Sequence, residues 1–219
     1  HLLQCRPQAR REEGEAFQMP ATVAKADILF TADRLVPRGR VQRIRHIVFV
    51  DPEAYDHIPD ETTRLQVARV VGRLNKSLEE KRFILMGPGR WGSANLDLGV
   101  KVTYADIYRT AMLIEIGLSH GESAPEVSYG THFFQDLVEA KIHPLALYPE
   151  QSVVVFNWRF FRESPNVLAE LLPDSARYAD YVRVIDVPAV ARGRFLEVIM
   201  DDEESKALGY LRYYPKQRT

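Results

Sequence analysis

Cysteine is almost absent from this sequence, with Cys5 the only one among 219 residues. A single cysteine excludes an intramolecular disulfide framework and a zinc site built on cysteine pairs. The six histidines show neither His-x-His nor His-x-x-x-His spacing, so no metal site is predicted from them either. This composition suits a reducing compartment, and we expect a cytoplasmic location.

Long apolar runs and an excess of charge of one sign are also missing. No run approaches the roughly 20 apolar residues that a membrane-spanning helix needs, and no signal peptide is visible. The 29 Lys and Arg residues balance 30 Asp and Glu residues, giving a formal net charge of −1. This balance argues against nucleic acid or an anionic membrane as a partner. The chain begins with His1, which favours reading it as part of a longer protein.

Apolar and β-branched runs alternate with segments of helical periodicity. Strands are expected at 22–32, 41–52, 82–86, 100–107, 110–118, 144–149, 152–161, 181–188 and 194–201, and the pattern of 110–118 is also compatible with a helix. Helices are expected at 59–81, 131–142 and 166–173, with 202–214 as a helix or turn. The order predicts an α+β or mixed α/β fold, in which flanking helices cover a central, mostly β-sheet. We expect one such domain over 17–219, preceded by a terminal strand and linker over 1–16.

The stretch LMGPGRWGS follows a buried strand and combines three glycines with an arginine. Glycines permit close approach of the backbone to an anion, and an arginine offers a planar fork of donors. The candidate anion-binding residues are Gly87, Gly89, Arg90, Gly92 and Ser93. The phosphate-loop lysine is absent, and no helix is expected to follow the glycines. The alternative is a structural loop with Trp91 packed as its anchor.

A second glycine-containing stretch, SYGTHFFQDL, opens a predicted helix. Gly130 and Thr131 would expose backbone donors there, so both are further anion-binding candidates. His132 in the first turn is the candidate acid or base. An enzyme built on it would use Arg90 as an anion clamp, with Asp106 or Asp136 as an orienting carboxylate. The alternative is a histidine that only packs beside its neighbouring phenylalanines.

Basic residues gather around a predicted hairpin at 34–45. Arg34, Arg38, Arg40, Arg43 and Arg45 occur there without an intervening acidic residue. One hypothesis is an interaction module that meets a polyanion or an acidic partner through this hairpin. The other is a charged edge strand that resists aggregation.

The first residues, LLQCRPQ, resemble the closing strand of the ATP-grasp domain of phosphoenolpyruvate synthase and pyruvate phosphate dikinase. That strand carries Gln-x-Arg-Pro, here Gln4 to Pro7. The resemblance implies that Gln4 and Arg6 face nucleotide phosphates, and that the longer protein binds ATP and Mg²⁺. Two further blocks, MGPGRWGSANLDLGVKVTYADI and SYGTHFFQDLVEA, are similar to blocks downstream of that domain in proteins with a PEP/pyruvate-binding domain.

The chain departs from the synthases in one important segment. They continue into a swivelling domain with a Ser-His-Ala segment, whereas Ser119-His120 is followed here by Gly121-Glu122. The resemblance therefore implies a C-terminal accessory or regulatory domain of an ATP-dependent phosphotransferase, inactive by itself and without a retained cofactor. Its expected partners are the ATP-grasp domain of the same protein and a small anionic ligand, and it is compatible with an oligomer.

Overall fold

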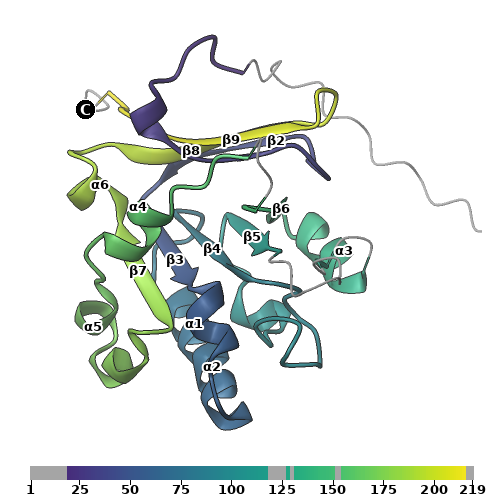
Figure 1. Ribbon diagram of the computed structural model, residues 1–219, viewed down its shortest axis with the longest axis vertical. Helices are drawn as coiled ribbons and strands as arrows, with labels where there is room; N and C mark the ends of the chain where they lie inside the picture. The colour runs from purple at the N-terminus through teal and green to yellow at the C-terminus, as the bar shows by residue number, and fades with distance from the viewer. Residues whose placement is uncertain (1–18, 118–126, 129–130, 151–153, 216–219) are drawn as a thin grey trace, which may run out of the picture.

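The computed structural model describes residues 19–117, 127–128, 131–150 and 154–215. These residues form two stacked β-sheets, with helices covering the outer face of the larger sheet (Figure 1). The predicted mixture of strands and helices is confirmed. The strands, however, divide between two sheets and do not form a single central one. The expected strand and linker of residues 1–16 lie outside the described residues.

The larger sheet has five strands in the order β6-β5-β4-β3-β7. They are β3 (His46–Val50), β4 (Phe83–Pro88), β5 (Met112–Ile116), β6 (His143–Leu147) and β7 (Val182–Asp186). Strands β3 to β6 run parallel to one another, and β7 runs antiparallel beside β3. Ends of the same polarity therefore gather at one edge, called the carboxyl edge below. Ligands of open α/β sheets bind outside such an edge.

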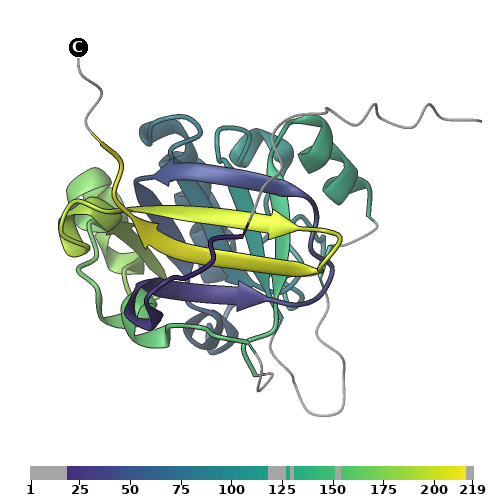
Figure 2. The same ribbon diagram turned by 90° about the horizontal axis from the view of Figure 1, so that it is seen from above.

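The smaller sheet joins strands from both ends of the described chain. Its strands are β1 (Ile28–Ala32), β2 (Gly39–Ile44), β8 (Phe195–Asp201) and β9 (Lys206–Arg212). They pair antiparallel in the order β1-β9-β8-β2. Figure 2 shows this sheet from above, with the yellow-green C-terminal pair between the two purple N-terminal strands.

Six α-helices and three short 3₁₀ helices are described. They are α1 (Pro52–Asp56), α2 (Glu61–Ser77), α3 (His132–Glu139), α4 (Trp158–Glu163), α5 (Leu168–Leu171), α6 (Val187–Val190), η1 (Lys25–Asp27), η2 (Tyr104–Asp106) and η3 (Pro173–Tyr178). Side chains of Asp51, Asp60, Thr131 and Asn157 cap α1 to α4 by accepting backbone N–H bonds. Among the described helices, none has the length and apolar character needed to cross a membrane.

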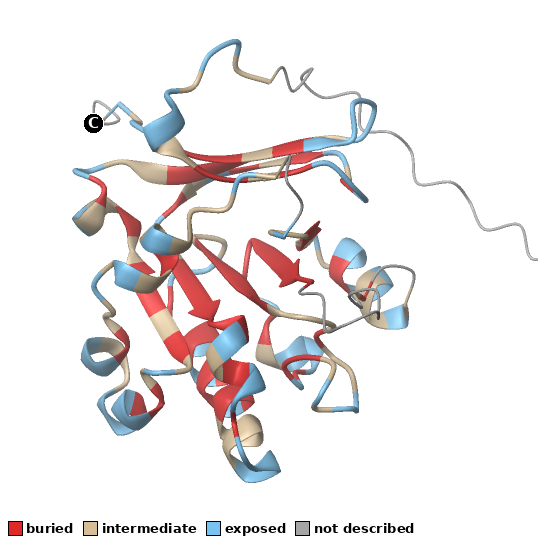
Figure 3. Cartoon of the chain, in the orientation of Figure 1, coloured by how far each residue is buried: buried red, intermediate tan, exposed pale blue. Residues whose placement is uncertain are grey.

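Two apolar clusters hold the layers together, as the red interior of Figure 3 shows. One fills the space between the sheets and includes Phe30 of β1, Phe49 of β3 and Phe161 of α4. The other joins the five-stranded sheet to its helices and includes Val71 of α2 and Leu85 of β4. Both faces of the central strands are thus covered, which explains uninterrupted apolar runs such as the one in β4.

The predicted strand over 41–52 is in fact two strands that belong to different sheets. Strand β2 ends at Ile44 and pairs with β8, whereas β3 begins at His46 and pairs with β4 and β7. The chain therefore passes between the sheets at Arg45. β-Branched alternation predicts extended backbone, but it carries no information on which neighbour a strand pairs with.

Four other secondary-structure predictions are wrong. The expected strand at 22–32 begins only at Ile28, because η1 (Lys25–Asp27) occupies its first half. The expected strand at 100–107 contains η2, because Thr103 and Asp106 form a capping box that starts a helical turn. The expected strand at 152–161 contains the start of α4, because Asn157 caps a helix there. Residues 206–212, expected as helix or turn, form β9, because pairing with both β1 and β8 outweighs local propensity.

Candidate functional site

The glycine-rich loop leaves β4 at the carboxyl edge, but its backbone donors are already engaged. Four successive N–H groups donate within the chain: Gly89 to Ile116 O (2.8 Å), Arg90 to Leu98 O (2.6 Å), Trp91 to Glu115 Oε1 (2.9 Å) and Gly92 to Val100 O (3.2 Å). A phosphate cradle needs such donors to point at the ligand. An anion at this loop would therefore depend on the side chains of Arg90 and Ser93.

The backbone of this loop requires glycine at two positions for structural reasons. Gly89 has φ +57°, and a Cβ there would lie 1.9 Å from the carbonyl oxygen of Leu98. Gly92 has φ +73°, and a Cβ there would lie 2.7 Å from the Phe133 ring of α3. Trp91 is 1% exposed, in agreement with the alternative of a packed anchor. The loop is a tight turn held between the 98–100 segment and α3.

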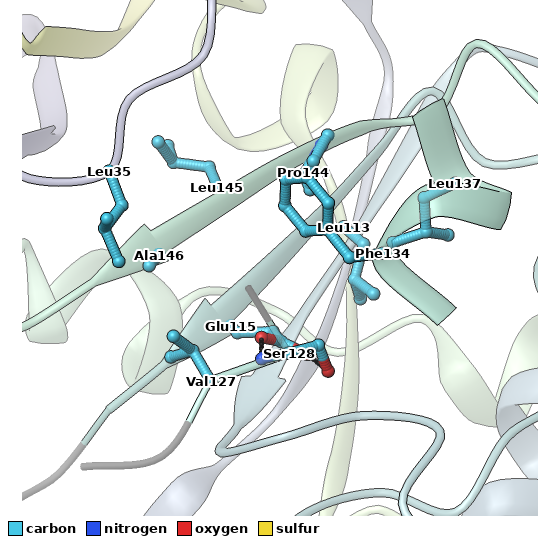
Figure 4. A pocket seen from close by; sticks show the side chains of 10 residues that line it. All are labelled: Leu35, Leu113, Glu115, Val127, Ser128, Phe134, Leu137, Pro144, Leu145 and Ala146. Atoms are coloured by element: carbon cyan, nitrogen blue, oxygen red, sulfur yellow. Dashed lines mark hydrogen bonds between the residues drawn. The ribbon is translucent and has the colours of Figure 1, made fainter. Parts of the chain in front are cut away.

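Glu115 of β5 ties this loop to the segment that precedes α3. Its carboxylate accepts the Trp91 N–H at 2.9 Å and the Ser128 N–H at 2.5 Å, and the Ser128 hydroxyl lies 2.6 Å away. Figure 4 shows Glu115 and Ser128 side by side at the end of a narrow, mostly apolar pocket. That pocket has a volume of about 10 Å³, which is room for about one water molecule and not for an organic ligand.

Glu115 and Trp91 O compete for the single proton of the Ser128 hydroxyl. The Ser128 hydroxyl has one proton but two oxygen neighbours, Trp91 O at 2.9 Å and Glu115 Oε1 at 2.6 Å. A protonated Glu115 would donate to Oγ and leave the serine proton for Trp91 O. Burial raises the pKa of Glu115, although bonds from Ser128 and Trp91 and the charge of Arg90 oppose the rise. Glu115 is therefore a buried clamp whose charge depends on pH.

The start of α3 adjoins the loop, and His132 and Asp136 lie one turn apart on that helix. Thr131 caps α3 by accepting the Phe134 N–H at 3.3 Å, and its hydroxyl donates to Ser128 O at 2.7 Å. His132 is the first residue of α3 and is exposed, and Asp136 is exposed one turn further on. The fold brings Gly92 to Phe133, so the two stretches share one surface. Gly130 lies outside the described residues.

Asp106, the other candidate for an orienting carboxylate, has a structural role. Its Oδ2 accepts the Thr103 N–H at 2.8 Å and the Thr103 hydroxyl at 2.7 Å, which completes the cap of η2. The same side chain packs against Gly72 of α2. Asp106 therefore stabilises the contact between α2 and η2, and these contacts do not involve His132.

The hairpin predicted around 34–45 does not form, because β1 and β2 lie at opposite edges of the four-stranded sheet and pair with β9 and β8. Most of the arginines of this segment are paired within the fold. Arg40 and Arg212 flank the buried Glu197 at 2.6 and 3.0 Å, and Tyr214 donates to the same carboxylate at 2.5 Å. Elsewhere Arg38 pairs with Glu203, Arg45 pairs with Asp186, and Arg43 stacks on Tyr214. These contacts give the arginines a structural role, and β2 is an edge strand, in line with the charged-edge alternative.

A larger hollow at the carboxyl edge was not predicted from the sequence. It has a volume of about 350 Å³ and lies where α1 and α4 face the residues that follow β6. Its lining residues are Glu53, Asp56, His57, Pro149, Glu150, Trp158 and Arg162. We call it the edge hollow. Its residues come from three separate segments, none of which carries a recognisable spacing, so only the fold could reveal it.

Arg162 organises one wall of the edge hollow. Its Nε and Nη2 donate to the two carboxylate oxygens of Asp51 at 2.7 and 3.0 Å, and Glu53 lies 3.0 Å from Nη2. The guanidinium also stacks on Trp158, 4.4 Å from the ring centroid. Burial alone would lower the pKa of Arg162, but Asp51 and Glu53 outweigh it and raise that pKa. Arg162 is thus a fixed cation whose charge its neighbours already balance.

His57 also lines the edge hollow, and a backbone contact defines the role of one of its ring nitrogens. Its Nδ1 lies 2.7 Å from Glu53 O, and a carbonyl oxygen only accepts hydrogen bonds. The neutral ring therefore carries its proton on Nδ1 and offers Nε2 as an acceptor. With the carboxylates of Glu53 and Asp56, the lining has many acceptors and few donors.

Comparisons of the chain with protein-family models, with curated proteins and with solved structures found no match. Gln4 and Arg6, to which the resemblance assigns contacts with nucleotide phosphates, lie outside the described residues. In the described ranges, no group of three or more His, Cys, Asp and Glu side chains could hold a metal ion.

Proposed function

We propose that this chain is an accessory domain that binds a small ligand at the carboxyl edge of its five-stranded sheet. The observation that carries this proposal is the edge hollow, whose 350 Å³ falls within the range of small-molecule sites. Its position outside the ends of parallel strands is also where ligands bind in open α/β sheets. By the resemblance of its sequence, the longer protein is an ATP-dependent, PEP-synthase-like phosphotransferase that uses Mg²⁺, with the ATP-grasp domain as this domain's partner.

The lining of the edge hollow favours a ligand that carries an amine or guanidinium group. Glu53, Asp56 and the Nε2 of His57 present acceptors, whereas the Arg162 donors point at Asp51 and Glu53. Trp158 also lines the hollow, although its ring already stacks on Arg162. A cation with several N–H donors matches this set, and a phosphate would meet uncompensated carboxylates.

The anionic ligand expected from the sequence remains the second candidate, and Arg90 is the residue that would bind it. Arg90 follows β4 in the loop that contacts α3 through Gly92, and its planar fork suits phosphate or carboxylate. The engaged backbone of 89–92 removes the donors that would strengthen such a site. The two candidates predict ligands of opposite charge and different residues.

Isothermal titration of the chain separates the candidates. The cation arm uses spermidine, arginine and ethanolamine, and the anion arm uses phosphate, phosphoenolpyruvate, pyruvate and ATP. We expect binding in the cation arm, and about three- to ten-fold weaker binding after Asp56→Asn, because a charged acceptor is lost.

The matched control is Asp202→Asn, which removes an exposed carboxylate in the turn between β8 and β9 and should leave the affinity unchanged. Binding of anions alone, abolished by Arg90→Ala and retained in Asp56→Asn, would replace the edge hollow with the Arg90 surface. Absence of binding in both arms would reject the ligand-binding role.

A further inference from the structure

The outer side of α2 carries a row of basic side chains that the fold leaves unpaired. Arg69, Arg73 and Lys76 are exposed, and their spacing places them side by side on one face of the helix. Within the described part of the chain, none of these three side chains makes a hydrogen bond or ion pair. At 1.5 Å per residue the row is about 10 Å long.

Exposed aromatic rings lie beside this row, on the 101–109 segment. Tyr104 is 43% exposed and Tyr108 is 39% exposed, with ring centroids 6.2 Å apart. The segment is joined to α2 because the Asp106 side chain packs on Gly72 and the Arg109 N–H donates to Asn75 Oδ1 at 3.0 Å. Gly72 lies on the same side of the helix as Arg69 and Lys76, so rings and cations share one surface.

The charge of this surface differs from that of the whole molecule. Arg109, whose Nη1 donates to the Lys76 carbonyl at 2.8 Å, adds to the α2 row, and the exposed Lys101 lies on the same segment as the two tyrosines. The acidic residues alongside are Glu80, 3.7 Å from Arg109, and the capping Asp106. A chain with a net charge of −1 therefore concentrates cations on one helix face. The arginines at 34–45, several of them in ion pairs, do not form a comparable surface.

We propose that this surface, made of Arg69, Arg73, Lys76, Lys101, Tyr104 and Tyr108, binds single-stranded nucleic acid. Proteins that bind single strands combine cations along the phosphate backbone with aromatic rings on which bases stack. The unpaired row supplies the first element and the two tyrosines supply the second. An acidic protein segment would use the cations but would gain nothing from base stacking.

The test is fluorescence anisotropy of a labelled oligouridylate and an oligothymidylate against this chain, over a range of salt concentrations. We expect binding that weakens as salt rises. The double variant Arg69→Gln/Arg73→Gln should lower the slope of log affinity against log salt by about 1.4, because each phosphate contact on a single strand contributes about 0.7. Tyr104→Ala and Tyr108→Ala should each weaken binding about five-fold or more, while the Phe variants retain it.

The matched control is Arg38→Gln/Arg159→Gln, which removes two exposed arginines outside this surface and should leave binding unchanged. Circular dichroism melting checks that each variant is folded. Equal binding to heparin or polyglutamate, insensitive to the tyrosines, would show an acidic-protein surface and overturn the proposal. No binding at low salt, or equal loss in the control, would also overturn it.

Discussion

At the scale of single residues, two buried glutamates show opposite electrostatics. Glu115 lies among apolar side chains with Ser128 and Trp91 as neutral partners, and burial raises its pKa. For Glu197, burial alone would raise the pKa, but hydrogen bonds from Tyr214 and Arg40 outweigh it and lower that pKa. The surroundings of each glutamate, and not the residue type, decide whether its protonated or its charged form is favoured.

The first prediction concerns Glu115→Gln. A glutamine offers one oxygen where two accept N–H bonds, so we expect a loss of about 1–3 kcal/mol in the free energy of unfolding at acidic pH. Because the folded-state pKa is raised, the stability that Glu115 contributes is present below its ordinary pKa and falls as pH rises through the raised value. Urea unfolding across pH should show the difference from wild type shrinking toward neutral pH. A difference that grows with pH would contradict the raised pKa.

The second prediction concerns Glu197→Gln and has the opposite sign. Because the folded-state pKa is lowered, the contribution of Glu197 is present above its ordinary pKa and is lost as pH falls through the lowered value. We expect a loss of about 1–3 kcal/mol at neutral pH, because Arg40 and Arg212 lose a charged partner. The same urea experiments should show variant and wild type converging in acid. Glu203→Gln, on an exposed turn, is the control and should be nearly neutral.

At the scale of elements, the glycine-rich loop shows how far a motif can be interpreted. The letters GPGRWG indicate a tight turn and equally a phosphate loop, because glycine permits both. The decision depends on where the N–H groups of residues 89–92 point, and they donate to Ile116, Leu98, Glu115 and Val100. Those acceptors are distant in sequence, so no local pattern contains the answer.

The third prediction compares two glycines with positive φ. Gly89→Ala places a Cβ against the backbone oxygen of Leu98, whereas Gly193→Ala, at φ +82°, meets nothing within 4 Å. Backbone conformation alone should destabilise Gly193→Ala by about 1 kcal/mol. Gly89→Ala should lose at least about 2 kcal/mol, because the contact adds to that strain. Thermal unfolding measures both, and equal losses would mean that the loop relaxes around the added methyl group.

At the scale of the whole molecule, α4 joins the two sheets. Phe161 is fully buried between them, with ring centroids 5.4 Å from Phe49 of β3 and 4.8 Å from Phe156, which bridges to β1. The same helix carries Arg162 into the edge hollow. The packing between the sheets and the shape of the hollow therefore depend on one short helix.

The fourth prediction follows from this position. Phe161→Ala should lower the free energy of unfolding by about 3–5 kcal/mol, because it leaves a cavity between two rigid sheets. It should also lower the affinity of any ligand that binds in the edge hollow, because α4 positions Arg162 and Trp158. Denaturant unfolding and titration of the folded variant measure the two effects. Tyr213→Ala, at a ring 63% exposed, is the control and should change stability by about 0.5 kcal/mol or less.

The sequence by itself determined the mixed composition of strands and helices and most of the central elements. Apolar periodicity identified α2, β4 and α3, because local spacing and caps decide whether such segments can bury one face, whereas the pattern around β5 also fitted a helix. Only the tertiary structure decided that 41–52 divides between sheets and that 206–212 is a strand. It also decided that the edge hollow and the basic face of α2 exist. These features arise from contacts between distant segments, whose free energies no local pattern of residues records.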